Sequence, residues 1–145
     1  MNRNIKFRGK CKNTGKWIYG YLSDETETLL GKKYTRKVIF EDLKSFQTDN
    51  FAYVVRNLEV IPETVGQFTR LYDKNKEEIY EDDILCLNHN GSNYLVVVGW
   101  NNEVGAWCIR FDTERIVGVK PLGEWLCDYS MEVIGSIHDN LGLLK

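Results

Sequence analysis

Aromatic and aliphatic residues alternate near the start of the chain in the pattern of a β-strand. The rings of Trp17, Tyr19 and Tyr21 occupy every second position, which places them on one face of such a strand. An Asn-Thr-Gly turn precedes them, so residues 4–11 and 16–22 are predicted to pair as a hairpin. The other elements predicted for this part of the chain are strands at 36–40 and 52–55 and a helical turn or two at 41–50.

After Pro62 the pattern changes to short β-prone runs separated by turn residues. The predicted strands are residues 84–87, 94–100, 106–111, 116–119 and 131–137. The Asn90-Gly91 step supplies the positive φ angles of a tight turn between the first two. Five short strands joined in this way predict a small curled sheet or an SH3-like barrel, which hides its strand edges by closing.

Two segments of the C-terminal part have a helical character. The pattern of residues 121–127 fits either a helical turn or an irregular crossing segment. The last residues, 138–145, are predicted to form a helical turn capped by Asp139 or Asn140.

The expected fold is therefore mainly β with some short helix. An N-terminal β-rich region with a hairpin and a variable middle covers residues 1–62, and a compact barrel-like region covers residues 63–145. We expect the two regions to form one folding unit, because 145 residues are enough for a single domain with a real core.

Composition supports a globular protein outside the membrane. Apolar residues make up 43% and charged residues 28% of the chain, which indicates neither disorder nor membrane insertion. The longest apolar run, residues 95–98, is far shorter than the roughly 20 residues of a membrane span. The first residues lack the apolar segment of a signal peptide, so we expect a cytoplasmic protein that does not contact membranes.

Charge is segregated along the chain although the net charge is only −2. Residues 1–23 carry six basic and no acidic residues, and residues 73–83 carry six acidic residues against two lysines. On an extended strand, alternate side chains of the first segment share one face at a spacing of about 6.6 Å, close to the repeat of an extended single-stranded nucleic acid. Aromatic rings on the neighbouring strand offer stacking surfaces for bases. The candidate nucleic-acid-binding residues are Lys6, Arg8, Lys10, Lys12, Trp17 and Tyr19.

The same basic segment has a second interpretation, which we favour over nucleic acid. It is a solvated strand face whose charge is matched by the acidic segment of the same or a neighbouring subunit. Docking of the basic strand of one subunit on the acidic turn of another, around an apolar patch of Trp17, Tyr19 and Tyr21, predicts a homo-oligomer. Pairing within one subunit would leave a monomer.

Candidate catalytic and metal-binding motifs fail at specific positions. The four cysteines are widely separated and form no Cys-x-x-Cys pair, which favours reduced, packed thiols over a zinc site. Asp73, Asn75 and Glu77 match the first positions of a calcium loop, but Glu78 stands where glycine is needed and Ile84 where the last acidic ligand is needed. No phosphate-binding loop or nucleophile elbow is complete. We therefore expect a protein that is not an enzyme and that uses no metal or cofactor.

Three blocks of the chain resemble the YopX family of phage and prophage proteins. They are the N-terminal Ile5-Lys6-Phe7-Arg8, the block from Val65 to Leu85 and the block from Glu132 to Leu144. The middle block is the most specific of the three, through its Asp-Lys-Asn turn followed by Ile79-Tyr80-Glu81-x-Asp83-Ile84. Residues 12–62 match only loosely.

The resemblance implies a genetic setting without naming a chemistry. It points to a phage or prophage gene product of unknown molecular role, an accessory or binding protein in the cytoplasm of the bacterial host, with no catalytic residues to transfer. It also implies self-association, and a host or phage protein is the other expected partner. Family members commonly have glycine at the positions of Lys76 and Asp82 here, so a left-handed backbone at Lys76 would cost about 1 kcal/mol that glycine avoids.

Overall fold

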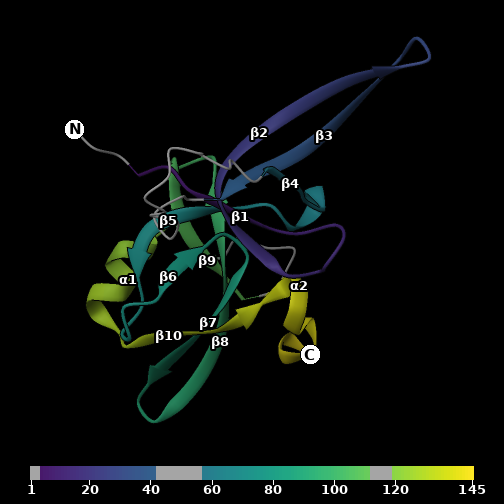
Figure 1. Cartoon of the computed structure of the whole chain (residues 1–145). Coiled ribbons are helices and arrows are strands. Elements are labelled where there is room, and N and C mark those ends of the chain that lie inside the picture. Colours follow the sequence, from purple (N-terminus) through teal and green to yellow (C-terminus); the bar gives the residue numbers. More distant parts are fainter. Residues whose placement is uncertain (1–3, 42–56, 112–118) are drawn as a thin grey trace, which may run out of the picture. The chain divides into compact units, whose positions relative to one another are not determined.

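Antiparallel strands dominate the structure, which confirms the mainly β prediction (Figure 1). The computed structural model describes residues 4–41, 57–111 and 119–145. Contacts divide the chain into two units, which we call unit 1 (Met1–Gln67) and unit 2 (Phe68–Lys145). The division falls within one strand, so the first two residues of that strand belong to unit 1 and the others to unit 2.

Unit 1 is built on one antiparallel sheet. Its elements are β1 (Phe7–Lys10), β2 (Trp17–Leu29), β3 (Lys32–Glu41), β4 (Asn57–Glu59), the 3-10 turn η2 (Pro62–Thr64) and the start of β5 (Gly66–Tyr72). The strand order is β4-β3-β2-β1, and β5 pairs with β1 through Gly66 and Gln67. The predicted hairpin of residues 4–11 and 16–22 is confirmed as β1 and the first part of β2, with Arg8 opposite Tyr19 and Lys10 opposite Trp17.

One face of this sheet forms the core of unit 1. Cys11, Ile18, Ile39 and Val60 are buried together there, and half-buried aliphatic and aromatic side chains pack around them. Gly20 is required by the close approach of β3, because a Cβ atom at this position would lie 1.8 Å from the carbonyl oxygen of Phe40. Because side chains alternate between the two faces of a strand, the other face of the sheet lies outside this core. That face carries Arg8, Lys10, Trp17 and Tyr19.

Unit 2 contains a four-stranded antiparallel sheet in the order β10-β7-β8-β9. Its elements are the rest of β5, β6 (Glu78–Tyr80), β7 (Asp83–His89), β8 (Ser92–Asn101), β9 (Ala106–Arg110), α1 (Leu122–Asp128), β10 (Met131–Ser136), α2 (Ile137–Asn140) and η3 (Leu141–Leu144). The edge strands β10 and β9 do not pair with each other, so the sheet is open and closes no barrel within the described residues. Of the two predicted alternatives, an open sheet is the one observed.

The core of unit 2 lies mainly on β7 and β8. Leu85, Val96 and Val98 are fully buried and pack with aliphatic residues of β6, β9 and α1. The predicted tight turn between these strands is confirmed, since Asn90 has φ 50° and Gly91 φ 79°. Val97, on the opposite face of β8, is fully buried as well. Burial on both faces of β8 explains why residues 94–100 stand out in the sequence as a strongly β-prone run.

Several predicted elements need correction or lie outside the described residues. The ambiguous segment 121–127 is a helix, α1. The predicted C-terminal helical turn forms as α2 and η3. Ser136 caps α2, since its hydroxyl accepts a hydrogen bond from the His138 amide at 3.3 Å. Asn140 occupies the N-cap position of η3, but its side chain makes no capping hydrogen bond there. The predicted strands at 52–55 and 116–119 and the helical turn at 41–50 fall wholly or mostly in the parts that the structure does not describe.

Candidate binding site

The basic side chains of β1, and that of Lys6 just before it, lie over the aromatic rings of β2. The guanidinium carbon of Arg8 is 4.5 Å from the centre of the Trp17 ring, and the Lys10 ammonium is 5.8 Å from the same centre. The Lys6 ammonium lies 5.9 Å from the centre of the Tyr19 ring. Five of the six candidate residues predicted from the sequence are thus brought together on one face of unit 1.

This arrangement changes what the face can bind. A cation over an aromatic face is attracted by the ring quadrupole, at distances up to about 6 Å. Arg8 is only 7% exposed and lies over the Trp17 ring. It therefore occupies the ring face on which a base would stack. Lys12 stands apart, because its ammonium forms an ion pair with Glu59 at 2.8 Å. Phosphate contact at this face would therefore depend mainly on Lys6 and Lys10, and nucleic-acid binding stays a prediction.

In the acidic segment of residues 73–83, the carboxylate of Asp73 is hydrogen-bonded to backbone amides of unit 2. One carboxylate oxygen of Asp73 accepts hydrogen bonds from the amides of Asn75 at 2.7 Å and Glu77 at 2.9 Å. The other accepts one from the Val133 amide at 3.0 Å, which ties this turn to β10. Both oxygens are thus bonded to backbone amides, which gives the buried Asp73 a structural role in place of the calcium-ligand role that its position resembles. Lys76 in this turn has φ 68°, which confirms the left-handed backbone expected there.

Asp82 holds a second polar cluster in unit 2. Its carboxylate oxygens lie 2.7 Å from an Arg110 guanidinium nitrogen and 3.1 Å from Nε2 of His138. Its backbone has φ 65° and bonds on both sides, to the Val98 carbonyl and the Ile137 amide. Asp82 therefore connects β8, β9 and the start of α2, and like Asp73 it serves the internal structure of unit 2.

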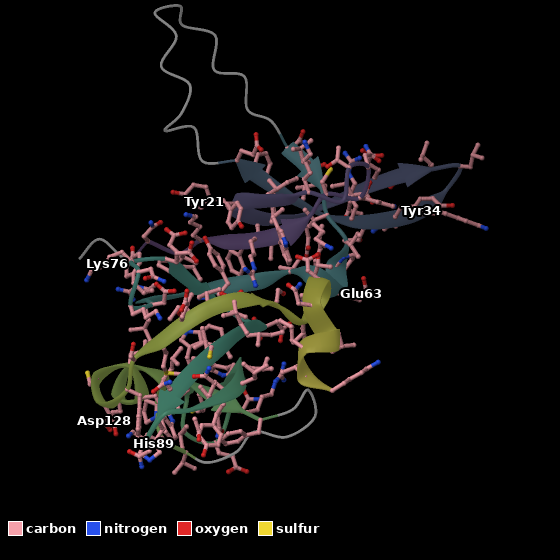
Figure 2. The ribbon with its side chains drawn as sticks, turned by 90° about the horizontal axis from the view of Figure 1, so that it is seen from below. Tyr21, Tyr34, Glu63, Lys76, His89 and Asp128 are labelled. Carbon is pink, nitrogen blue, oxygen red and sulfur yellow. The ribbon has the colours of Figure 1, made fainter. Side chains whose placement is uncertain are left out.

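The most exposed element of unit 1 is a hairpin that the sequence patterns did not reveal. We call the outer part of β2 and β3, residues 24–37, the arm. Figure 1 shows this hairpin extending past the ends of β1 and β4. Most of its side chains on both faces are exposed. Leu30 at the tip is fully exposed at 103% of its reference surface, and Tyr34 is 54% exposed (Figure 2).

The arm is held together by cross-strand polar contacts in place of a core. Arg36 bridges Glu25 at 2.8 Å and Glu27 at 2.9 Å. Thr26 and Thr35 share a hydrogen bond of 3.1 Å, and Lys37 pairs with Asp24 at 2.8 Å. These pairs join residues directly opposite each other, apart from the diagonal Arg36–Glu27 pair, as cross-strand pairs that stabilise a sheet do.

Hydrogen bonds also shift the pKa values of the central pair of the arm. The hydrogen bond from Arg36, followed by that from Asn57, lowers the pKa of Glu25 from its ordinary value. The hydrogen bond to Glu25 raises the pKa of Arg36 in turn. The pair is therefore charged throughout the neutral range.

Other features of the described residues complete this description. In residues 4–41, 57–111 and 119–145, no group of three or more His, Cys, Asp and Glu residues is placed to hold a metal ion. The same ranges contain no helix that is long and apolar enough to cross a membrane. All four cysteines are free; Cys11 and Cys108 are buried, and burial raises the pKa of the Cys108 thiol.

A solved structure shares the fold of this chain. The crystal structure of protein EF1440 from Enterococcus faecalis superposes with a TM-score of 0.51 at 19% sequence identity. The match covers 99% of this chain and 100% of the other. At this identity the likeness establishes the fold alone.

The family comparison agrees with the resemblance seen in the sequence. A comparison with curated proteins gives no significant match. The model of the YopX protein family, in contrast, matches residues 6–145, which includes the arm, the basic face and the whole of unit 2. The chain therefore belongs to the YopX family.

Proposed function

We propose that this protein is a non-enzymatic accessory protein that acts by binding, and that its first partner is a second copy of itself. The observation that carries the proposal is the arm. An isolated two-stranded hairpin is marginally stable in water, yet this one extends beyond its neighbouring strands with an exposed leucine at its tip. Exposed apolar residues that gather on one surface, as Leu29, Leu30 and Tyr34 do on the arm, mark interaction sites.

The backbone at the tip adds support. Leu30 has φ 51°, in the left-handed region that costs a residue with a side chain about 1–2 kcal/mol. Its side chain gains no burial in return. A strained and fully exposed apolar residue suggests a function in contacts with another molecule.

Polar residues in unit 2 support the non-enzymatic part of the proposal. Asp73 and Asp82 are the acids that a calcium loop or a catalytic cluster would need, and each makes at least three bonds to its own unit. These bonds account for both carboxylates within unit 2, which supports a structural role for each of them.

We extend the proposal to a phage or prophage gene product that acts in the cytoplasm of a bacterial host, where a host or phage protein would be the next partner. Membership of the YopX family supports this setting.

Light scattering coupled to size-exclusion chromatography tests the proposal. We expect a molar mass that is a multiple of 16.9 kDa and rises with protein concentration. A monomer at every concentration would overturn self-association. Turnover of nucleotides or cleavage of nucleic acids that disappears in an Asp82→Asn variant would overturn the non-enzymatic assignment.

The alternative function is a module that binds single-stranded nucleic acid through its basic N-terminal strand. The observation that favours it is the set of cations gathered over Trp17 and Tyr19. Binding should then weaken with salt by a logarithmic slope of about −0.7 for each phosphate contacted. A Lys6→Glu/Lys10→Glu variant should reduce that slope, while Lys16→Glu in the exposed turn serves as the matched control. Equal slopes in all three proteins, or no binding at low salt, would contradict it.

A further inference from the structure

The two strands of the arm carry opposite charges. The stretch of β2 from Tyr21 to Leu29 contains three acidic residues and no basic one. The stretch of β3 from Lys32 to Lys37 contains four basic residues and no acidic one. We call these stretches the acidic edge and the basic edge of the arm.

Both edges lack a neighbouring strand among the described residues. β1 pairs with β2 only from Trp17 to Gly20, and β4 pairs with β3 only from Val38 to Phe40. Beyond these points each strand of the arm pairs only with the other, except that the Lys37 carbonyl accepts a hydrogen bond from the Val60 amide at 3.0 Å. Unpaired strand edges present rows of backbone donors and acceptors, which are ready to pair with another chain.

From these two observations we infer that the arm of one copy adds edge to edge to the arm of the next, acidic edge against basic edge. The inference rests on the self-association proposed above and names its surface. Charge decides the pairing, because two acidic edges or two basic edges would place like charges directly opposite each other. Only unlike edges give each acid a base on both sides.

The register of such a pair follows from the hairpin itself. An acidic edge that repeats the internal register places Glu25 opposite Arg36 and Thr26 opposite Thr35 of the next copy. The added strand is antiparallel, so all arms point in the same direction. The contact uses two different surfaces of each copy, and such contacts generate a ring when the rotation closes and an open chain when it does not.

Exposed apolar residues supply what the ion pairs lack. Surface ion pairs contribute little by themselves. Arms that point the same way bring their tips together, so that Leu29 and Leu30 of one copy lie beside those of the next. The exposed rings of Tyr21 and Tyr34 stand on the face of the arm that carries Leu29 and would extend the apolar contact. This arrangement gives the strained Leu30 tip a contact to make.

Disulfide cross-linking tests the register directly. We use Thr26→Cys and Thr35→Cys as two separate proteins, each with Cys127→Ser to remove the exposed native thiol. Neither protein alone can bridge its own strands, since each has one engineered thiol. Under mild oxidation we expect a cross-linked dimer from the mixture and none from either protein alone. A dimer from Thr26→Cys alone would show that two acidic edges pair, and it would overturn the inference.

Charge exchange tests the complementarity. Glu27→Lys alters the acidic edge and Lys32→Glu alters the basic edge at a neighbouring position on the same face. Each variant alone should self-associate about fivefold more weakly, the scale expected of one exposed ion pair. Mixing the two should restore wild-type association, because every contact in an alternating assembly regains one acid and one base. Lys16→Glu is the matched control and should change nothing.

The outcomes separate the two proposals. If the wild-type protein is monomeric and the mixture of the two cysteine variants gives no cross-link, both proposals are overturned. If the wild-type protein is an oligomer, but the two cysteine variants do not cross-link and neither charge variant changes the association, only the arm contact is overturned. Both proposals are supported if the mixed cysteine variants cross-link and the mixed charge variants regain the molar mass of the wild-type oligomer.

Discussion

Two of the hairpins in the described residues have similar turns and opposite surroundings. The arm belongs to the β2–β3 hairpin, in which ten residue pairs are in register. The β7–β8 hairpin of unit 2 has six such pairs. Its strands bury Leu85, Val96 and Val98, whereas most side chains of the arm are exposed.

The tips of the two hairpins make the comparison sharper. Leu30 and Gly31 have φ angles of 51° and 78°, and Asn90 and Gly91 have 50° and 79°. The backbone turn is thus nearly the same in both. Asn tolerates the left-handed region much better than Leu does. The difference shows that burial stabilises one hairpin, and that cross-strand pairs stabilise the other at the cost of a strained apolar tip.

The largest expected effect separates the two leucines. Leu85→Ala should lower the free energy of unfolding by about 2–5 kcal/mol, because it opens a cavity in the core of unit 2. Leu30→Ala should change it by less than about 0.5 kcal/mol, since that side chain is already in solvent. Urea denaturation of monomeric samples measures both. Equal losses in the two variants would mean that the tip of the arm is covered in solution.

The second prediction compares two carboxylates. Asp73→Ala leaves three backbone amides without their acceptor and should destabilise unit 2 by about 1–3 kcal/mol. Asp24→Ala removes an exposed ion pair with Lys37 and should cost less than about 1 kcal/mol. Hydrogen exchange of the Asn75, Glu77 and Val133 amides reports the first loss locally. Slow exchange that persists in Asp73→Ala would contradict the role assigned to it.

The sequence predicted the buried strands well and the solvated strands of the arm poorly. The strands β7, β8 and β9 have apolar alternation or apolar runs, because the core selects those residues, and their positions were predicted to within a few residues. The sequence Asp24-Glu25-Thr26-Glu27-Thr28 has no such pattern. The arm was therefore missed, since no core imposes a period on it. Its remaining signals were the β-prone threonines and the Leu30-Gly31 step, which lacks the asparagine typical of such turns.

The candidate basic face was predicted in outline but not in its chemistry. Strand alternation was enough to place Lys6, Arg8 and Lys10 on the face of Trp17 and Tyr19. It could not show that Arg8 would be buried against Trp17, because that depends on the pairing of β1 with β2 and on how tightly the side chains pack. Likewise, the count of acids at residues 73–83 gave no sign that Asp73 and Asp82 are committed to their own unit.

The third prediction exchanges the two tips. Leu30→Asn should stabilise the arm by about 1 kcal/mol, because Asn adopts φ near 50° at lower cost. Asn90→Leu should destabilise the β7–β8 turn by a similar amount. Amide exchange at the pairs next to each turn measures the two changes. Leu30→Asn should also weaken self-association if the tip contributes to the contact. If this variant self-associates more tightly, the Leu30 side chain does not contribute to the contact, and its backbone strain has no link to binding.

The smallest effect is a pH dependence confined to the arm. The folded pKa of Glu25 lies below its unfolded value, mainly through the hydrogen bond from Arg36. A group whose pKa is lowered on folding stabilises the folded state above its unfolded pKa, about 4.3 for Glu, and loses that contribution as the pH falls through its folded pKa. We therefore expect the amides of Glu25 and Arg36, which point across the hairpin as a hydrogen-bonded pair, to lose protection as the pH falls through the folded pKa of Glu25. The buried pairs of β7 and β8 should keep theirs. NMR-detected exchange between pH 6 and pH 3 follows both hairpins in one sample. Glu25→Gln is the matched control, because it keeps the size of the side chain, removes its titration and should make exchange in the arm less dependent on pH. If the arm in Glu25→Gln still loses protection over the same interval as the wild type, another acid controls the arm and the assignment to Glu25 is wrong.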